Sequence, residues 1–485
     1  MIAESTNSTN RHETLRPSLV NAAGWTLGAL LLLNQIWAST GFLLDDEITH
    51  FWRSHSVWQN PKLLFDAWTR PGRNLLHVPA APLGLFWTRL YTCVLLGVGV
   101  WLTTECARKV GVKSAQWIPL LLLMQPWVVE LGSCVLTQTP FLLVWITAIY
   151  FDLGKKPALA GFLFGYLPLV RHEGIALSAC YALYCTLRGR WLGLVTLPIP
   201  IVTVDLAAHL AHQPLITRVY LDIKPTELYG SGPLWHFVVP TIHSAGYVIS
   251  ILAICSFRRV LQLYRQFPLF LTYPAYFALH SLIYWKGLFA SGGYVYFLMP
   301  MAPIVAISAR FGIDKVLANW NLPGAKRLFA LSVLLIVVQA WMLPHRTGSR
   351  HYVEPNRNWS EAFSKMYRGY PLSKDSCKRS LDDAKVWIES HPETANAYIV
   401  CCHSYLLMKM GKPETPQRLE LTYSKDLETV CDPILFVWES KYAPHNRGRQ
   451  KQEFERLNWS KIKEFDEGAV IIYSNIELLA SQAGS

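Results

Sequence analysis

Eleven apolar segments constrain the fold of this sequence more than any other feature. They centre on roughly residues 20–38, 84–103, 115–131, 135–151, 157–170, 174–187, 191–211, 235–256, 267–285, 294–309 and 327–344. A helix needs about 20 apolar residues to cross a bilayer, and most of these segments approach that length. Only 16% of the 485 residues are charged, whereas a soluble domain carries about a quarter. We therefore predict a polytopic, mainly α-helical membrane protein with about eleven transmembrane helices.

The distribution of Lys and Arg predicts how these helices are oriented. Basic residues gather in alternate connections, which hold Arg108, Lys109, Lys113, Lys155, Lys156, Arg188, Arg190, Arg258, Arg259, Arg265, Arg310, Lys315, Lys326 and Arg327. Because basic loops stay in the cytoplasm, we expect residues 1–18 to form a cytoplasmic tail of a multi-pass protein in the cytoplasmic (inner or plasma) membrane. The transmembrane domain would then be 19–344, with a first outer loop at 41–76, and residues 345–485 would lie on the extracytoplasmic side. The polar start of the chain argues against a cleavable signal peptide.

The net charge of +12 fits this orientation better than it fits a nucleic-acid partner. A nucleic-acid-binding domain would concentrate its charge in a basic stripe or show zinc-ligand spacing, and neither is present in the sequence.

Residues 345–485 alternate helical and extended patterns. Residues 380–390 and 404–410 read as helices, and 398–402, 434–438 and 469–473 read as strands. This order predicts a small α/β domain. Its cysteines are Cys377, Cys401, Cys402 and Cys431, which oxidising conditions outside the cell could pair in three ways.

Three consecutive carboxylates, Asp45, Asp46 and Glu47, follow the first apolar segment almost directly. A charge at the centre of a bilayer costs at least about 2.5 kcal/mol, so these acids belong at the interface or in a wet cavity. Acids held against a membrane indicate function, although a solvated helix end is the simpler alternative.

The outer loop that begins with these acids has helical periodicity. Apolar and aromatic residues recur from Ile48 to Trp58, so residues 47–59 are predicted to form an amphipathic helix lying on the membrane. Pro61 ends it, and a second short helix is predicted from Leu63 to Trp68. An aromatic belt that anchors the loop would explain the tryptophans equally well, but not the acids. His50 and His55 fit helix-face positions better than metal ligands, and we predict no metal site.

Several short motifs occur in an order that resembles one enzyme superfamily. They are Leu44-Asp-Asp-Glu47 with His50, Trp68-Thr-Arg-Pro71, Gln125-Pro126, Thr137-Gln-Thr-Pro-Phe141, Arg171-His-Glu-Gly174, and Gly287 to Tyr294 with Phe297 and Pro300. Together they resemble the loops of polytopic GT-C glycosyltransferases, which include the protein-O-mannosyltransferase-like and aminoarabinose-transferase-like enzymes of the glycosyltransferase family 39 type. The resemblance covers roughly residues 20 to 310. It departs at Gln138, where a Glu is expected, and at Val295, which stands near a usual Arg; the first removes an accessory acid and the second a phosphate contact.

The resemblance implies a hexosyl- or pentosyltransferase that depends on a polyprenyl-phosphate sugar donor. An acceptor hydroxyl of a glycan, lipid or protein would attack the anomeric carbon with inversion. A base must take the hydroxyl proton and cations must hold the departing phosphate. Asp46 is the preferred base because Asp46-Glu47 matches the family's Asp-Glu pair. Asp45 is the second choice, and Glu47 a positioning or proton-sharing neighbour. No cofactor is certain, and a divalent cation is possible.

The resemblance and the predicted topology together give a set of donor-phosphate and substrate-binding candidates. They are Arg70, Arg73, Arg171, Glu173, His212, Lys286 and Tyr294. Two of them have simpler explanations: Arg171 could form a structural ion pair with Glu173 or a first-loop acid, and Lys286 could be an interfacial lysine at a helix end. The segment from His212 to His236 either covers the acceptor or only connects two spans.

Two other functions remain open on the sequence. A membrane transporter of a lipid-linked glycan or other polar solute would place its ionisable groups near the middle of the bilayer. Here the acids and the candidate cations are predicted at one face, which favours chemistry at the interface. A member of the superfamily that has lost catalysis, and whose tail binds glycans, is the other alternative.

Overall fold

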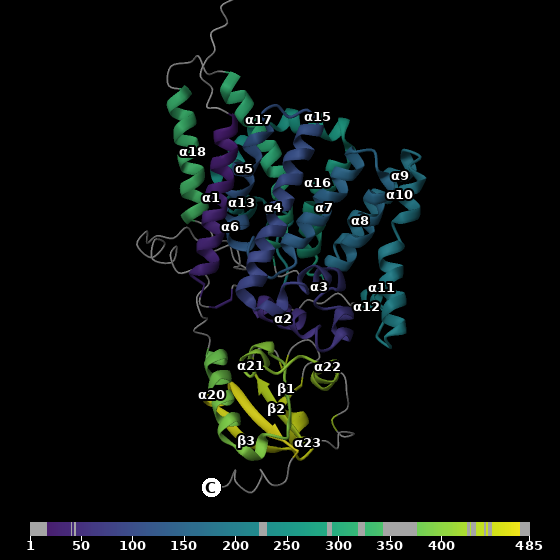
Figure 1. The fold of residues 1–485 in the computed structure, drawn as a ribbon, viewed down its shortest axis with the longest axis vertical. Helices are drawn as coiled ribbons and strands as arrows, with labels where there is room; N and C mark the ends of the chain where they lie inside the picture. Colours follow the sequence, from purple (N-terminus) through teal and green to yellow (C-terminus); the bar gives the residue numbers. More distant parts are fainter. Residues whose placement is uncertain are drawn as a thin grey trace, which may run out of the picture.

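The computed structural model describes residues 17–39, 41–42, 45–222, 230–288, 293–318, 325–342, 376–423, 427, 433–440, 443–444 and 449–475. Two parts are visible in Figure 1: a helical body that ends at residue 342, and a C-terminal domain that begins at residue 376. Short helices of the first outer loop lie between the two parts. This is the mainly α architecture with a small α/β domain that the sequence predicts.

Every predicted apolar segment contains helix in the structure. The helices of the body are α1 (Pro17–Trp37), α4 (Leu85–Lys109), α5 (Ile118–Leu123), α6 (Pro126–Leu131), α7 (Gln138–Leu153), α8 (Pro157–Val170), α9 (Gly174–Leu187), α10 (Trp191–Thr196), α11 (Ile199–Leu210), α12 (Ile216–Asp222), α13 (Val238–Ala245), α14 (Tyr247–Cys255), α15 (Phe257–Gln266), α16 (Thr272–Trp285), α17 (Ala302–Ala318) and α18 (Ala325–Met342). The agreement has a physical reason: backbone in a bilayer must satisfy its own hydrogen bonds, so a long apolar run in such a chain forms helix.

Three of the predicted segments hold two helices each: α5 and α6, α10 and α11, and α13 and α14. Pro126, which lacks an N–H, starts α6 and separates it from α5. The direction of the helix axis changes by 112° between α13 and α14. Gly246 at this bend has φ +92°, a conformation that only glycine adopts without steric cost.

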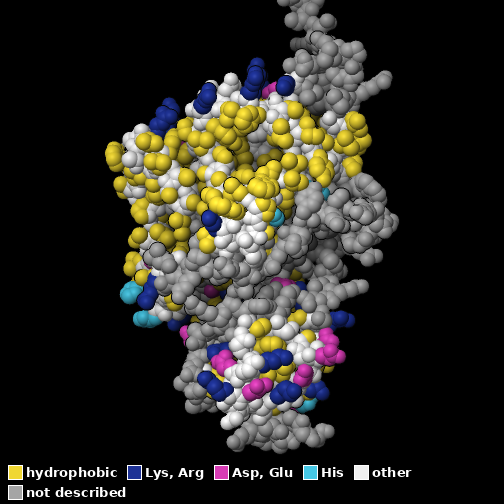
Figure 2. Space-filling model, turned by 180° about the vertical axis from the view of Figure 1, so that it is seen from behind, with side chains coloured by type: hydrophobic (Ala, Val, Ile, Leu, Met, Phe, Trp, Pro, Cys, Tyr) yellow, Lys and Arg dark blue, Asp and Glu magenta, His cyan; other side chains and the backbone are white. Residues whose placement is uncertain are grey.

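By length and apolar composition, four described helices can cross a membrane, and the bent α13–α14 pair would make a fifth. They are Leu19–Trp37, Leu85–Lys109, Trp191–Leu210 and Val295–Lys315, and further apolar helices of 10–17 residues are α7, α8, α9 and Ala330–Ala340. The predicted count of about eleven therefore includes short and broken helices. Leu187 and Leu210 are 75% and 71% exposed on a surface dominated by apolar side chains (Figure 2). So large an apolar surface belongs in lipid, and the body is that of a multi-pass membrane protein.

Charged side chains are distributed unevenly over the surface. Lys and Arg gather at the end of the helical body that lies away from the C-terminal domain, whereas the C-terminal domain carries both signs of charge (Figure 2). Lys113, Lys155 and Arg188 are exposed residues of the predicted basic connections.

The segment predicted to be the first outer loop forms α2 (Asp45–Ser56), the 3-10 helix η1 (Pro61–Phe65) and α3 (Pro71–His77). The predicted amphipathic helix is thus confirmed, although the second helix is a 3-10 turn that begins at Pro61. Ile48, Phe51 and Trp52 of α2 lie in a buried apolar cluster with Leu406 and other residues of the C-terminal domain. The expectation that this helix rests on the membrane is therefore wrong for its apolar face, because the C-terminal domain covers it.

The C-terminal domain is built on a four-stranded sheet with the order β1-β2-β4-β3. Its strands are β1 (Tyr398–Cys401), β2 (Ile434–Glu439), β3 (Ser460–Phe465) and β4 (Val470–Ser474), and its helices are α20 (Ser376–Ser390), α21 (Ser404–Lys409), α22 (Pro416–Tyr423) and α23 (Lys451–Arg456). β1 and β2 are parallel, and the other pairs are antiparallel. The sequence predicts every strand except β3, an edge strand whose Lys461 and Glu464 are exposed.

The cysteines of this domain do not form the predicted disulfide among the described residues. Cys377, Cys401 and Cys402 are not joined to one another by a disulfide. Cys431 lies outside the described residues, so pairing that involves it stays a prediction.

Candidate functional site

The acid cluster forms the first turn of α2, where the helix dipole stabilises negative charge. Successive side chains on a helix point about 100° apart. Asp45, Asp46 and Glu47 therefore face three different environments.

Glu47 is fully buried and forms an ion pair with Arg89 of α4. Arg89 Nε donates to Glu47 Oε1 at 2.9 Å and Nη2 donates to Oε2 at 2.8 Å. The Val135 backbone N–H also donates to Oε1, at 3.1 Å, and Arg89 Nη2 donates to the Gly41 carbonyl at 2.9 Å. Both carboxylate oxygens are occupied, so Glu47 fixes α2 to the helical body.

Asp45 points to the C-terminal domain. Lys378 Nζ of α20 lies 2.6 Å from Asp45 Oδ1, and His403 Nε2 lies 3.7 Å from the same oxygen. Burial alone would raise the pKa of Asp45, but His403 and Lys378 hold it well below its usual range. Asp45 is therefore a permanently ionised carboxylate.

Asp46 is half-buried, and among the described residues it has no hydrogen-bond or ion-pair partner. Burial and the adjacent Asp45 charge raise the pKa of Asp46 to about 6, against the opposing effect of Arg171. Asp46 therefore combines partial exposure with a pKa at which a carboxylate exchanges protons near neutral pH.

The turn between α8 and α9 places a cation close to Asp46. Arg171 is buried and makes a two-pronged pair with Glu173, with Arg171 Nε 3.2 Å from Oε2 and a hydrogen bond of 2.5 Å from Nη2 to Oε1. Arg171 Nη1 donates to Thr137 Oγ1 at 2.8 Å. Its guanidinium carbon lies 4.9 Å from the centre of the Phe297 ring. The ion pair that the sequence raised as an alternative for Arg171 is present in the structure.

Glu173 is the buried counter-ion of this turn. Burial raises its pKa, but Arg171, His172 and His280 together hold it well below the usual range. His280 of α16 is buried, with its Nε2 3.6 Å from Glu173 Oε1. Glu173 therefore balances the Arg171 charge, and its carboxylate is not the base.

The charge of Arg70 is less neutralised by its neighbours than the charge of Arg171. It is half-buried, and its Nη2 lies 3.0 Å from His172 Nδ1. Burial lowers the pKa of His172 to about 4, aided by the Arg70 and Arg171 charges, so this imidazole is neutral near pH 7. The guanidinium also contacts the Ala67 carbonyl and lies over the Tyr220 ring.

Arg73 is enclosed by protein. Its Nη1 donates to the His50 carbonyl at 2.8 Å and to Ser54 Oγ at 2.6 Å, and its Nη2 donates to the Val135 carbonyl at 2.8 Å. Burial lowers the pKa of Arg73 to about 9 in spite of the Glu47 charge. These hydrogen bonds of Arg73 hold α2 in place.

The other candidates lie at the edge of this site or apart from it. His212 is exposed after α11. Lys286 is exposed at the end of α16, with Nζ 4.0 Å from the Trp285 ring centre, as expected of an interfacial lysine. Tyr294 is half-buried, and its ring centre lies 6.0 Å from that of Phe297. Gln138 and Val295, the two departures, are both buried.

The sequence analysis missed four residues of the site: Arg89, His280, Lys378 and His403. For Arg89 a signal existed, because a cation inside an apolar segment needs a buried partner or a functional role. Lys378 and His403 had no local signal, since only the folding of the C-terminal domain onto α2 brings them near Asp45.

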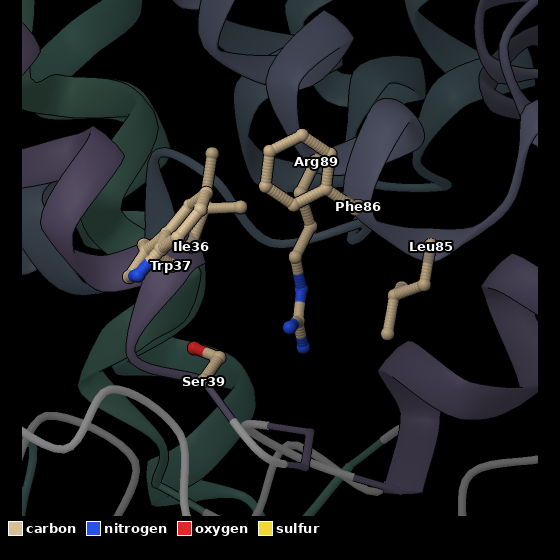
Figure 3. Close-up of a pocket in the computed structure, with 6 residues that line it drawn as sticks. All are labelled: Ile36, Trp37, Ser39, Leu85, Phe86 and Arg89. Atoms are coloured by element: carbon tan, nitrogen blue, oxygen red, sulfur yellow. The ribbon is translucent and has the colours of Figure 1, made fainter.

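An open pocket of ≈ 340 Å³ lies beside the acid cluster, between the end of α1 and the start of α4. It is lined by Ile36, Trp37, Ser39, Leu85, Phe86 and Arg89 (Figure 3). The Arg89 guanidinium reaches from α4 to the side of the pocket that holds Ser39. Within the described ranges, no three His, Cys, Asp or Glu side chains are arranged to hold a metal ion.

Fold and site define a class: a polytopic helical membrane protein with a small α/β domain docked on a loop helix that carries an acid cluster. The sequence matches no protein-family model, and no curated protein matches it significantly. Among solved structures it is similar to ArnT from Cupriavidus metallidurans bound to undecaprenyl phosphate, with a TM-score of 0.57 and 14% identity over 96% of this chain and 98% of that chain. For the apo state of the same protein the TM-score is 0.51, with 12% identity over 95% and 99% of the chains.

These similarities concern the fold, and they extend over nearly the whole of each chain. ArnT is an aminoarabinose transferase of the GT-C superfamily. The predicted resemblance to GT-C glycosyltransferases is therefore confirmed for the architecture.

The Glu47–Arg89 pair generates a test of what holds α2 in place. Arg89→Met leaves a buried carboxylate without its cation, which costs about 3–5 kcal/mol, and Glu47→Leu combined with Arg89→Met should recover part of that loss. Thermal unfolding in detergent measures both. Arg108→Met on the same helix removes an exposed partner of Glu105 and should cost about 1 kcal/mol or less. Equal melting temperatures for Arg89→Met and Arg108→Met would contradict the assignment.

Proposed function

We propose that this protein is an integral membrane glycosyltransferase that uses a polyprenyl-phosphate-linked sugar, with Asp46 as the general base. The observation that carries the proposal is the state of Asp46. It is the one acid of the cluster that has no hydrogen-bond or ion-pair partner among the described residues, and it lies within electrostatic range of Arg171. The fold similarity to ArnT bound to undecaprenyl phosphate supports the class of donor.

The proposed reaction is a single displacement at the anomeric carbon. The acceptor oxygen forms a bond to this carbon as the bond to the phosphate oxygen breaks, so the configuration inverts. The hydroxyl proton passes to Asp46, and the lipid phosphate leaves as an anion. The acceptor is a hydroxyl of a glycan, lipid or protein.

The phosphate requires cations, and the two candidates Arg70 and Arg171 are not equivalent. Arg171 is already balanced by Glu173, so its net attraction for an anion is small. Arg70 contacts a neutral imidazole and a carbonyl. We therefore assign the main phosphate contact to Arg70, and Arg171 provides further hydrogen bonds.

We also propose that the site faces the extracytoplasmic side. The cations at the far end of the helical body (Figure 2) fit a cytoplasmic surface by the positive-inside rule. The acid cluster and the C-terminal domain would then lie outside, with the N-terminal tail inside.

A labelling experiment tests this orientation. Gln59 and Lys113 are both exposed, at opposite ends of the helical body. In cells that express a variant without accessible native thiols, a membrane-impermeant maleimide should modify Gln59→Cys but not Lys113→Cys until the membrane is permeabilised. The reverse pattern would refute the proposed orientation.

The raised pKa of Asp46 predicts the pH dependence of the reaction. A base must be deprotonated, so the transfer rate should rise with pH through about 6 and then become constant. Asp45→Asn removes a negative charge that raises the Asp46 pKa, so the midpoint should move to lower pH. The shift of the midpoint is measured from initial rates over roughly pH 4–9, the range over which carboxylates and imidazoles titrate. Protein integrity is checked at each pH. An unchanged midpoint in Asp45→Asn would contradict the assignment.

Replacement of the base tests the function itself. Asp46→Asn keeps the shape of the side chain but cannot accept the proton, so transfer of labelled sugar from a polyprenyl-phosphate donor should fall on the order of a hundredfold or more. Donor binding should persist. Asp45→Asn should lose less activity. A wild-type protein that moves a labelled substrate across the membrane without forming product would support the transporter instead, and full activity in Asp46→Asn would exclude Asp46 as the base.

A further inference from the structure

The C-terminal domain holds α2 at both of its ends. At the N-terminal end, Lys378 and His403 reach Asp45. Near the C-terminal end, the Glu414 backbone N–H donates to Ser56 Oγ at 2.9 Å, and Trp52 Nε1 donates to the Lys412 carbonyl at 3.0 Å. The buried apolar cluster of α2, α20 and α21 lies between these polar contacts. Such a contact fixes the helix in both position and rotation.

The contact of Asp45 with Lys378 and His403 is buried, so water and dissolved ions compete with it poorly. The side chains of Lys378, His403 and Asp45 are only 8%, 1% and 14% exposed. A buried ammonium is tolerated only with a counter-charge close by, so Lys378 and Asp45 require each other. Neither solvent nor salt can readily replace this partner.

The geometry of His403 fixes which of its nitrogens meets Asp45. His403 is the N-cap of α21, and its Nδ1 accepts a hydrogen bond from the Tyr405 backbone N–H at 3.2 Å. A ring nitrogen that accepts a hydrogen bond carries no proton, so His403 carries a proton on Nε2, the nitrogen that lies 3.7 Å from Asp45 Oδ1. Lys378 Nζ makes the close contact with this oxygen at 2.6 Å, and His403 faces the same oxygen from beyond hydrogen-bond distance.

From this geometry we propose that Lys378 and His403 are positioning residues of the active site. By binding Asp45 across the domain boundary, they orient the first turn of α2 and leave Asp46 as the single base. The C-terminal domain would then contribute positioning residues to the active site. The inference rests on the proposed glycosyltransferase function.

The alternative arrangement shows why the contact matters. Without Lys378, Asp45 would lose its close cation, and the two adjacent carboxylates would titrate as a coupled pair. The first turn of α2 would also lose its tie to α20. A displacement of about 1 Å at a reacting group can cost about a hundredfold in rate.

The test uses the full-length protein in lipid nanodiscs with a polyprenyl-phosphate sugar donor. Lys378→Met keeps the length of the side chain without the charge, and it should lower kcat about tenfold to a hundredfold. The KM for the donor should change by about twofold or less, because the Arg70 and Arg171 contacts remain. Lys378→Arg should restore most of kcat, since it restores the charge.

A matched control lies on the same helix. Lys385 of α20 pairs with Glu389 at 2.8 Å on the surface, and Lys385→Met makes the same chemical change away from α2. It should leave kcat unchanged. The exchange of charges in Asp45→Lys with Lys378→Asp should recover activity relative to either single variant, and thermal unfolding checks that each variant is folded.

Each outcome decides between the proposals. A folded Lys378→Met protein with wild-type kcat overturns the positioning role while the glycosyltransferase function stands. A loss of kcat that matches the loss of folded protein, without rescue by Lys378→Arg, shows a purely structural contact and overturns it too. A wild-type protein that forms no glycosylated product overturns the function and, with it, this inference.

Discussion

The buried ion pair between Glu47 and Arg89 is the constraint on which the rest of the site depends. Three adjacent carboxylates repel one another, and they can share one helical turn only if neighbouring cations neutralise part of the charge. α4 provides the partner for Glu47, and α20 provides the partner for Asp45. Because side chains on a helix diverge by about 100° per residue, the two partners can approach from different sides. Asp46 then remains as the acid of the cluster without an ion-pair partner among the described residues, which is why it is the proposed base.

The sequence predicts the helical body well because the physical rule is local. A segment in a bilayer must satisfy its own backbone hydrogen bonds, so apolar length alone indicates a helix, and segments 157–170 and 174–187 coincide with α8 and α9. The same locality explains why α2 was predicted from its periodicity. β3 was missed because its Lys461 and Glu464 face solvent at a sheet edge, where no apolar alternation is needed.

The partners of the acids could not be predicted in this way, with one exception. Arg89 lies inside an apolar segment, and an isolated cation there indicates a buried counter-charge, although not which one. Lys378 and His403 belong to ordinary amphipathic sequence in a distant part of the chain. Their roles arise only when the apolar face of α2 meets α20 and α21. The sequence also assigned that face to the membrane, since both a bilayer and a docked domain satisfy an amphipathic helix.

The arginines of the site also differ in how far neighbouring groups neutralise their charge. Arg73 and Arg171 are both buried, so each needs acceptors within the protein: carbonyls for Arg73, and Glu173 for Arg171. Arg70 is only half-buried and keeps most of its charge for a ligand. The proposed base, whose pKa is raised, and a cation that has no carboxylate partner among the described residues are the two groups that a reaction creating a phosphate anion requires. Burial therefore distinguishes the side chains that the protein neutralises from those proposed to react.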